Sequence, residues 1–123
     1  MEKICLDTDV IVDFLRGDKT IVKKIQYYAD REEICMTSNS LFQIMVGVKN
    51  GEALSAFINN ISILDFGRKT AETAARIIDE ARDRGKEFSV DNVITAATCI
   101  ENNAFLFTKN RKDFEFVKGL KLV

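Results

Sequence analysis

The sequence contains no histidine and no proline among its 123 residues, and only three cysteines. Without histidine there is no Ser-His-Asp triad, no Cys-His pair and no zinc site with imidazole ligands. Catalysis by this chain would have to use carboxylates, lysine, cysteine, tyrosine, hydroxyl groups or a metal ion held by oxygen atoms.

The cysteines, Cys5, Cys35 and Cys99, are odd in number and widely spaced, and no CxxC pair occurs. This pattern favours free thiols in a reducing cytoplasm over a disulfide framework, and we expect Cys5 and Cys35, which lie in apolar runs, to be buried. No apolar run approaches the roughly 18 residues that a membrane span needs. The N-terminal segment becomes acidic within its first nine residues, which is unlike a secretory signal. We therefore expect a cytoplasmic protein without membrane contact.

The charges are balanced, with 18 basic and 19 acidic side chains. This balance argues against nucleic-acid binding by the net charge of the protein. It does not exclude binding through a local basic patch. The length and the hydrophobic content of 46% are those of one soluble domain with one core. We expect a single domain over residues 1–123.

Short apolar runs alternate with longer segments of helical periodicity. The predicted strands cover residues 4–6, 33–36, 61–64, 104–107 and 120–123. The predicted helices cover residues 10–15, 20–29, 41–48, 53–58, 69–84 and 92–102, and either Ser89 or Asp91 can cap the last of these. This order predicts an α/β fold built from right-handed βαβ units around a parallel sheet. In such sheets the functional site lies beyond the carboxyl ends of the strands, at the switch point.

Polar side chains follow several of these strands or begin the helix that precedes one, and we expect them to meet at one sheet edge. They are Asp7, Thr8, Asp9, Thr37, Ser38, Gln43, Asp91, Asn92, Thr108, Lys109, Asn110 and Asp113. Singly, each has an ordinary explanation as a helix cap, a turn residue or a surface residue. Together they predict an oxygen-lined pocket suited to Mg²⁺ or Mn²⁺, which could activate water for attack on a phosphodiester.

Three segments resemble the PIN domain family, especially the VapC-type toxins of bacterial and archaeal toxin–antitoxin pairs. The segments are LDTDVIVDFLRG, TSNSLFQIMVG and ITAATCIENNAFLFTKNRKDFEFVKGLKLV, and the resemblance runs from about residue 4 to residue 123. It implies a three-layer αβα PIN-like fold with a central, mainly parallel sheet of four to five strands. It also implies an endoribonuclease that depends on Mg²⁺ or Mn²⁺, acts on RNA, pairs with a cognate antitoxin and forms a homodimer.

The resemblance also implies positions for four catalytic acids. Asp7 matches the first of these acids and Asp113 matches the fourth. At the second position Gln43 stands where the family has glutamate, and at the third Asn92 stands where the family has aspartate. The implied metal ligands are Asp7 and Asp113, with Asp9 or Asp91 assisting. The polar residues expected to support them are Thr8, Ser38, Thr108 and Asn110.

Two acidic positions thus carry amides, which keep the shape of the acid and one oxygen acceptor but lose its charge. We therefore expect weak metal binding and impaired or abolished cleavage. Either a natural loss of the acids or a deliberate replacement that silences a toxic nuclease accounts for them. Asp91 could replace Asn92 only if the helix began one residue differently, because one step along a helix turns a side chain by about 100°.

Three basic residues, Lys109, Arg111 and Lys112, lie beside the acids and are candidates for contact with RNA phosphates. Their alternative is a solvated loop. Two other functions stay open: a non-catalytic PIN-like module that binds RNA or an antitoxin, and a phosphatase that forms an aspartyl-phosphate on Asp7, with Asp9 as acid and base.

Overall fold

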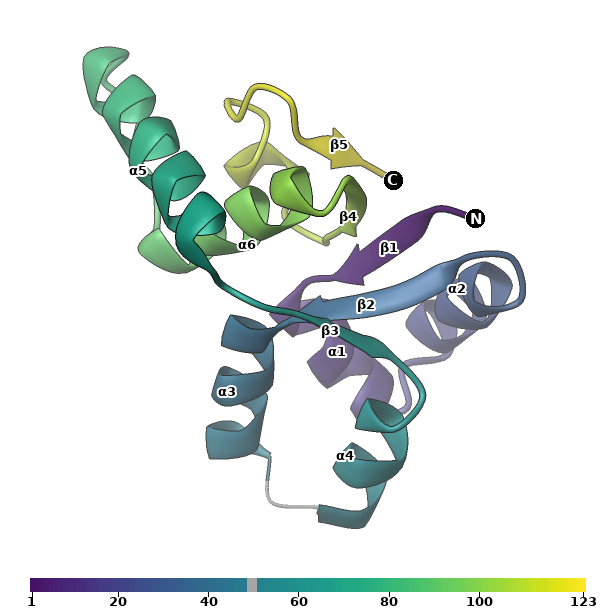
Figure 1. The fold of residues 1–123 in the computed structure, drawn as a ribbon. Helices are drawn as coiled ribbons and strands as arrows, with labels where there is room; N and C mark the ends of the chain where they lie inside the picture. The colour runs from purple at the N-terminus through teal and green to yellow at the C-terminus, as the bar shows by residue number, and fades with distance from the viewer. Residues whose placement is uncertain (49–50) are drawn as a thin grey trace.

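A computed structural model of the protein describes residues 1–48 and 51–123. Each of the first three strands is followed by a pair of helices (Figure 1). The strands are β1 (Lys3–Leu6), β2 (Glu33–Thr37), β3 (Ser62–Leu64), β4 (Ala104–Phe107) and β5 (Lys121–Leu122). The helices are α1 (Thr8–Leu15), α2 (Lys19–Ala29), α3 (Ser38–Gly47), α4 (Gly51–Ile58), α5 (Arg68–Asp83) and α6 (Val90–Glu101), with a 3₁₀ turn at Arg111–Asp113. Within the described residues, every helix is too short or too polar to cross a membrane.

The sheet has five strands in the order β3-β2-β1-β4-β5, and all neighbouring pairs are parallel. In its centre Ile4 of β1 lies opposite Ile34 of β2 on one side and Phe105 of β4 on the other. The chain moves outward from β1 through β2 to β3 and then returns to the other side of β1. The switch point therefore lies between the carboxyl ends of β1 and β4. The predicted α/β fold with a parallel sheet is confirmed.

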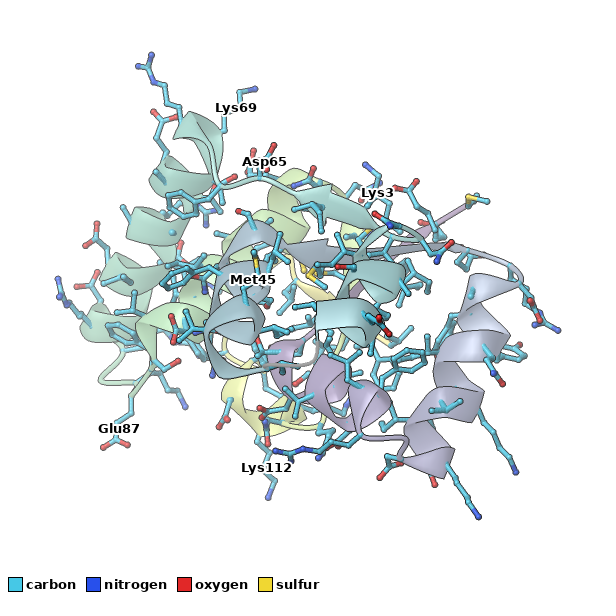
Figure 2. The ribbon with its side chains drawn as sticks, turned by 90° about the horizontal axis from the view of Figure 1, so that it is seen from below. Lys3, Met45, Asp65, Lys69, Glu87 and Lys112 are labelled. Carbon is cyan, nitrogen blue, oxygen red and sulfur yellow. The ribbon has the colours of Figure 1, made fainter. Side chains whose placement is uncertain are left out.

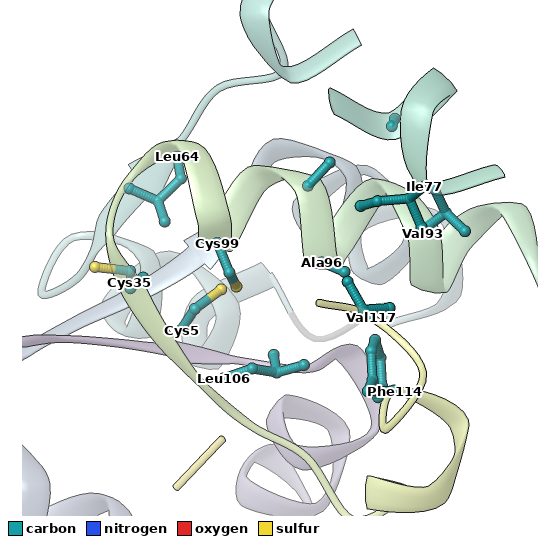
Figure 3. Close-up of a cluster of buried hydrophobic side chains, with 13 residues drawn as sticks. Cys5, Cys35, Leu64, Ile77, Val93, Ala96, Cys99, Leu106, Phe114 and Val117 are labelled. Carbon is teal, nitrogen blue, oxygen red and sulfur yellow. The ribbon is translucent and has the colours of Figure 1, made fainter. Parts of the chain in front are cut away.

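Helices cover both faces of this sheet, as expected for parallel strands joined by helices. Figure 1 shows α5 and α6 at the upper left, and α1, α3 and α4 in the lower half with α2 at the right. The upper core packs α5 and α6 side chains such as Ile77 and Val93 against Leu106 of β4 (Figure 3). The lower core joins Leu6 and Met36 of the sheet to side chains of the other four helices. Two cores on opposite faces hold the strand ends in fixed positions.

The three cysteines are all free and buried, as predicted for Cys5 and Cys35. They lie in the upper core, where the side chains of Cys5 and Cys99 point toward each other (Figure 3). Burial raises the pKa of the Cys35 thiol to about 12. This thiol therefore stays protonated and behaves as a small apolar group.

Four helices begin two or three residues earlier than the apolar periodicity predicts, and three of them, α1, α3 and α6, lie at the site edge. Helix α1 is capped by Asp7 rather than Asp9, and α6 is capped by Ser89 rather than Asp91. The third is α3, where the Thr37 hydroxyl accepts the backbone N–H of Ser40 at 2.9 Å. The physical reason is that polar residues are compatible with the first turn of a helix, so the cap and not the first apolar residue sets the start. Asp7, Thr37 and Ser89 are therefore the caps at which the chain enters these three helices.

Candidate functional site

Asp7 is a buried carboxylate at the end of β1, with 7% of its surface exposed. One of its oxygens, Oδ1, accepts the backbone N–H of Thr8 at 2.9 Å. The other, Oδ2, accepts the hydroxyl of Thr108 at 2.8 Å, just beyond the end of β4. Burial raises the pKa of Asp7, the two hydrogen bonds act in the opposite direction, and the nearby charges of Asp9 and Asp113 raise it further. The acid is thus held firmly at the switch point, in a place that disfavours its charge.

A cavity of about 240 Å³ opens beside Asp7 at the carboxyl edge of the sheet, and we call it the site cavity. Its lining residues are Asp7, Thr8, Asp9, Gln43, Ser89, Asp91, Asn92, Thr95 and Asn110. They come from α1, α3, α6, the residue that caps each of α1 and α6, and the loop after β4. The predicted convergence of these segments at one sheet edge is therefore found in the structure.

A chain of polar contacts crosses the site cavity from α1 through α3 to α6. The Thr8 hydroxyl donates to Oε1 of Gln43 at 3.0 Å, and the Ser40 hydroxyl lies 2.8 Å from the Thr8 oxygen. Because the single Thr8 proton is used on Gln43, Ser40 is the donor in the second contact. Nε2 of Gln43 donates to Oδ2 of Asp91 at 2.8 Å. A glutamate at position 43 could not make this last bond, since an ionised carboxylate only accepts.

Asp91, rather than Asn92, is the α6 side chain that meets Gln43. The second oxygen of Asp91 also lies 3.5 Å from Nδ2 of Asn39, a contact at the limit of hydrogen bonding. Asn92 lines the same cavity, and its backbone N–H donates to the Ser89 hydroxyl that caps the helix. The start of α6 at Val90 thus places a carboxylate opposite the glutamine.

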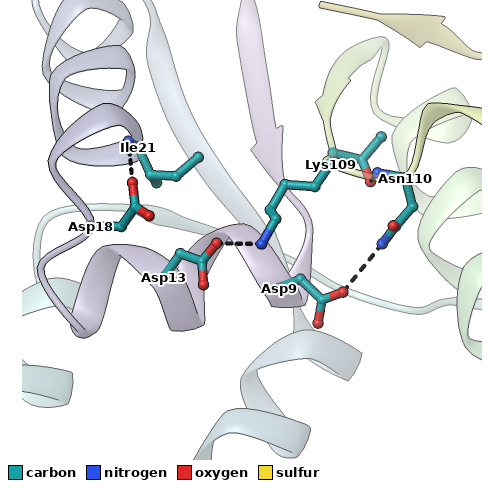
Figure 4. Close-up of polar contacts among 7 residues, drawn as sticks. Asp9, Asp13, Asp18, Ile21, Lys109 and Asn110 are labelled. Carbon is teal, nitrogen blue, oxygen red and sulfur yellow. Dashed lines mark hydrogen bonds and ion pairs between the residues drawn. The ribbon is translucent and has the colours of Figure 1, made fainter.

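The loop after β4 sends its side chains in different directions. Asn110 donates to Oδ2 of Asp9 at 3.2 Å and so closes one side of the site cavity (Figure 4). Lys109 forms an ion pair with Asp13 of α1 at 2.5 Å, which raises the pKa of the lysine (Figure 4). Arg111 donates to the backbone carbonyl of Val123. The predicted basic trio therefore does not form one patch.

Six predicted site residues lie outside the lining of the site cavity: Ser38, Thr108, Lys109, Arg111, Lys112 and Asp113. Asp113, with Lys112, lines a separate hollow of about 280 Å³ whose other walls come from residues 84–87 and 115–116. Ser38 is the first residue of α3, and its neighbour two positions on, Ser40, makes the contact with Thr8. The charge of Asp113 still contributes to the raised pKa of Asp7, and its predicted catalytic and metal-binding role stays a prediction.

The donors around the site cavity suit a hard cation in kind, because they are carboxylate, amide and hydroxyl oxygens. In number they fall short: among the described residues, no three histidine, cysteine, aspartate or glutamate side chains group closely enough to hold a metal ion. Each of the three carboxylates, from Asp7, Asp9 and Asp91, instead accepts a hydrogen bond from a neutral group. Gln43 supplies a neutral amide between them.

The sequence prediction missed Ser40, Ser89 and Thr95 as parts of this site. Ser40 is fully buried and touches Thr8, while Ser89 and Thr95 line the cavity. Spacing could have found two of them, since Ser40 lies three residues before Gln43 and Thr95 four after Asp91, each pair on one helix face. The contact between Ser40 and Thr8 could not be read from the sequence, because it joins residues 32 positions apart.

The PIN domain family model matches residues 4–120 of this chain. Among curated proteins, the chain is 28% identical over 130 residues to Ribonuclease VapC1 of Rickettsia felis, with 98% of this chain and 94% of that protein covered. It is 20% identical over 128 residues to the tRNA(fMet)-specific endonuclease VapC of Shigella flexneri, with coverage of 98% and 96%.

Solved structures show the same fold. The chain superposes on VapBC2 from Rickettsia felis, bound to a DNA fragment from its promoter, with a TM-score of 0.89 at 22% identity, covering 98% of this chain and 97% of that one. DNA-bound VapBC from Salmonella typhimurium gives a TM-score of 0.86 at 20% identity, covering 100% and 98%. The expected PIN-like αβα architecture is confirmed by these superpositions.

Proposed function

Because the chain belongs to the PIN domain family, we propose that it is a VapC-type ribonuclease scaffold, the toxin component of a toxin–antitoxin pair, acting on RNA in the cytoplasm. The observation that carries this proposal is the buried Asp7 at the switch point, held by Thr8 and Thr108 beside the carboxylates of Asp9 and Asp91. The names of its curated relatives, a ribonuclease and a tRNA-specific endonuclease, support RNA as the substrate.

We propose Asp7 as the central ligand of Mg²⁺ or Mn²⁺, with Asp9 or Asp91 assisting once the hydrogen bond that each now accepts is displaced. When bound, such an ion lowers the pKa of a water molecule and neutralises charge on a phosphate. Thr108 keeps Asp7 in place, Gln43 orients Asp91, and Asn110 orients Asp9. Asn92 would add an amide oxygen to the cavity, and Asp113 would act on Asp7 only through its charge.

The same arrangement supports impaired cleavage in this chain. The Gln43 amide fills the position between α1 and α6 without adding charge, and it uses one Asp91 oxygen for its own hydrogen bond. A cation would have to displace that bond, and it would gain fewer carboxylates than the family pattern offers. We therefore expect weak metal affinity and slow turnover.

The decisive experiment replaces Gln43 by glutamate. Mn²⁺ affinity, measured by calorimetry, should rise on the order of tenfold or more, because a charge close to a bound cation contributes well over ~1 kcal/mol in a partly buried site. Cleavage of RNA in Mn²⁺ should appear or increase, and Asp91→Asn added to the Gln43→Glu variant should abolish both gains.

Asn59→Asp is the matched control, because it adds the same charge at an exposed position after α4 and should change neither quantity. Asn92→Asp tests the other α6 position and should raise Mn²⁺ affinity less than Gln43→Glu does. If neither Gln43→Glu nor the double variant Gln43→Glu, Asn92→Asp cleaves RNA in Mn²⁺, the chain is a non-catalytic binding module instead.

The aspartyl-phosphate alternative is the weaker one for this fold. It needs Asp7 free to attack a phosphorus atom, whereas both Asp7 oxygens accept hydrogen bonds from neighbouring groups. It also gives no role to the contacts among Thr8, Ser40 and Gln43.

We further propose a protein partner and a second copy of the chain. The relevant solved neighbours include a toxin–antitoxin complex from Klebsiella pneumoniae, which supports an antitoxin as partner. An apolar hollow of about 460 Å³ between α1, α2 and α4, with Phe14 and Phe57 in its wall, is our candidate for that contact. For the homodimer the candidate is the outer face of α3, where Phe42, Met45 and Val46 are 66%, 61% and 66% exposed.

A further inference from the structure

A second hollow, of about 320 Å³, lies between α2 and the β4–β5 side of the sheet. We call it the tyrosine hollow. Its lining residues are Lys23, Lys24, Tyr27, Tyr28, Phe107 and Val123. Two ammonium groups and three aromatic rings thus share one concave surface, and no aspartate or glutamate side chain lines it. This composition suits an anionic ligand that also carries a flat ring.

The rings of the tyrosine hollow are held in a fixed arrangement. Tyr28 meets Phe107 edge to face, with ring centres 6.0 Å apart, and Tyr27 meets Tyr28 in the same way at 5.5 Å. The guanidinium of Arg31 lies 4.0 Å from the centre of the Tyr27 ring and covers one of its faces. Tyr27 nevertheless keeps 55% of its surface exposed. An exposed ring on a rigid support is a ready platform for stacking.

The lysines stand next to these rings. Nζ of Lys24 lies 5.9 Å from the centre of the Phe107 ring, and Lys23 is its neighbour on the exposed side of α2. Neither lysine takes part in an ion pair within the described residues. Their charges are therefore available to an incoming phosphate.

One short loop connects the tyrosine hollow to the site cavity. Phe107, in the wall of the hollow, is followed by Thr108, whose hydroxyl holds Asp7. Asn110 lines the site cavity, and Arg111 binds the carbonyl of Val123, which lines the hollow. The end of β4 and the loop after it therefore connect the walls of the site cavity and of the tyrosine hollow.

We propose that the tyrosine hollow is a subsite for one nucleotide of single-stranded RNA, flanking the bond to be cleaved. The base stacks on Tyr27, and the backbone phosphate pairs with Lys23 and Lys24. This inference rests on the proposed function for the identity of the strand as RNA. An unpaired strand is required, because a base within a duplex cannot stack on a protein ring. An acidic peptide would use the lysines but would leave the aromatic platform without a role.

The chain itself provides a probe of this site. It has two tyrosines and no tryptophan, so its intrinsic fluorescence comes only from Tyr27 and Tyr28. Binding of a short single-stranded oligoribonucleotide, with EDTA present to prevent cleavage, should shorten the tyrosine fluorescence lifetime. The lifetime is the appropriate quantity because absorption of light by the RNA does not alter it.

Affinity for the same oligoribonucleotide, labelled and followed by anisotropy, tests each contact. Tyr27→Leu should weaken binding on the order of tenfold, as expected for the loss of one stacked base. Lys23→Gln and Lys24→Gln together should reduce the slope of log affinity against log salt by about 0.7 for each phosphate contact that is lost. Phe66→Leu and Lys69→Gln, exposed positions before and within the first turn of α5, are matched controls and should leave both quantities unchanged.

Three results would overturn the subsite. RNA binding that is unaffected by the Tyr27 and lysine variants would remove the subsite while leaving the proposed function intact. Absence of any RNA binding, even by the Gln43→Glu variant, would remove both. A hexaglutamate peptide that binds with the same dependence on Tyr27 and Lys24 would assign the hollow to an acidic peptide instead.

Discussion

At the scale of the residue, Asp7 illustrates a conflict between function and stability. Its carboxylate is buried between Thr8 and Thr108, and burial raises its pKa from the ordinary value of 3.8. A raised pKa means that the folded protein binds the proton more tightly than the unfolded chain does. Stability therefore falls as the pH rises from 3.8 through the raised pKa and stays at the lower level above it, since the charge must then be kept in a poorly solvated place.

Asp7→Asn should consequently stabilise the metal-free protein at neutral pH. We expect a gain in the free energy of unfolding on the order of 1 kcal/mol, because the amide removes the buried charge and its Oδ1 can still accept the Thr8 N–H. The gain should shrink as the pH falls through the raised pKa of Asp7, where the wild-type carboxyl group becomes protonated. Urea denaturation in EDTA at pH 4.5 and pH 8 measures it.

The exposed Asp65, in the loop before α5, provides the control for this pH dependence (Figure 2). Asp65→Asn should change stability little and equally at both pH values. A loss of stability in Asp7→Asn at pH 8 would mean that the charge of Asp7 is fully compensated in the fold.

At the scale of the element, the starts of the helices decide which side chains enter the site. The sequence predicted the existence of each helix and strand from apolar spacing, and it named both Ser89 and Asp91 as caps of α6. It did not decide between them, since both residue types cap helices well. The structure selects Ser89, and α6 then begins at Val90 with Asp91 in its first turn, opposite Gln43.

The Ser89 cap should therefore be measurable as a stability contribution. Ser89→Ala removes the acceptor for the Asn92 N–H, now 3.0 Å away, and should lower the free energy of unfolding by about 1 kcal/mol. Ser89→Asp should keep most of that stability, because its carboxylate accepts the same bond. Chemical denaturation of the variants measures the difference.

Ser55→Ala, at an exposed position inside α4, is the control for the loss of a hydroxyl group. It should be neutral or slightly stabilising, because alanine is the better helix former. If Ser89→Ala proved equally harmless, the start of α6 would be fixed by packing of its buried face and not by the cap.

At the scale of the whole molecule, the strand order β3-β2-β1-β4-β5 brings residues 7, 43, 91 and 110 into one cavity. The same architecture leaves apolar residues of α3 on the surface, on the helix that carries Gln43 (Figure 2 labels Met45). Exposed apolar patches of this kind mark contact surfaces between proteins. Our proposed homodimer would cover this face.

The double variant Phe42→Asp, Met45→Asp should therefore dissociate the dimer. Sedimentation equilibrium should give about twice the chain mass of 13.9 kDa for the wild type and the single mass for the variant. Tyr27→Asp, an equally exposed aromatic position on α2, should leave the dimer unchanged. A monomeric wild type would mean that another partner covers α3.

The sequence by itself determined the class of the fold, the residue types of the site and the absence of histidine chemistry. These follow from local facts: apolar spacing sets strands and helices, polar residues follow strand ends, and a missing side chain cannot act. Only the tertiary structure decided that Asp91 meets Gln43, that Ser40 supports Thr8, and that Asp113 lines a neighbouring hollow. The physical reason is that a helix turns by about 100° per residue. One or two residues at its start, together with packing against distant segments, therefore decide where each side chain points.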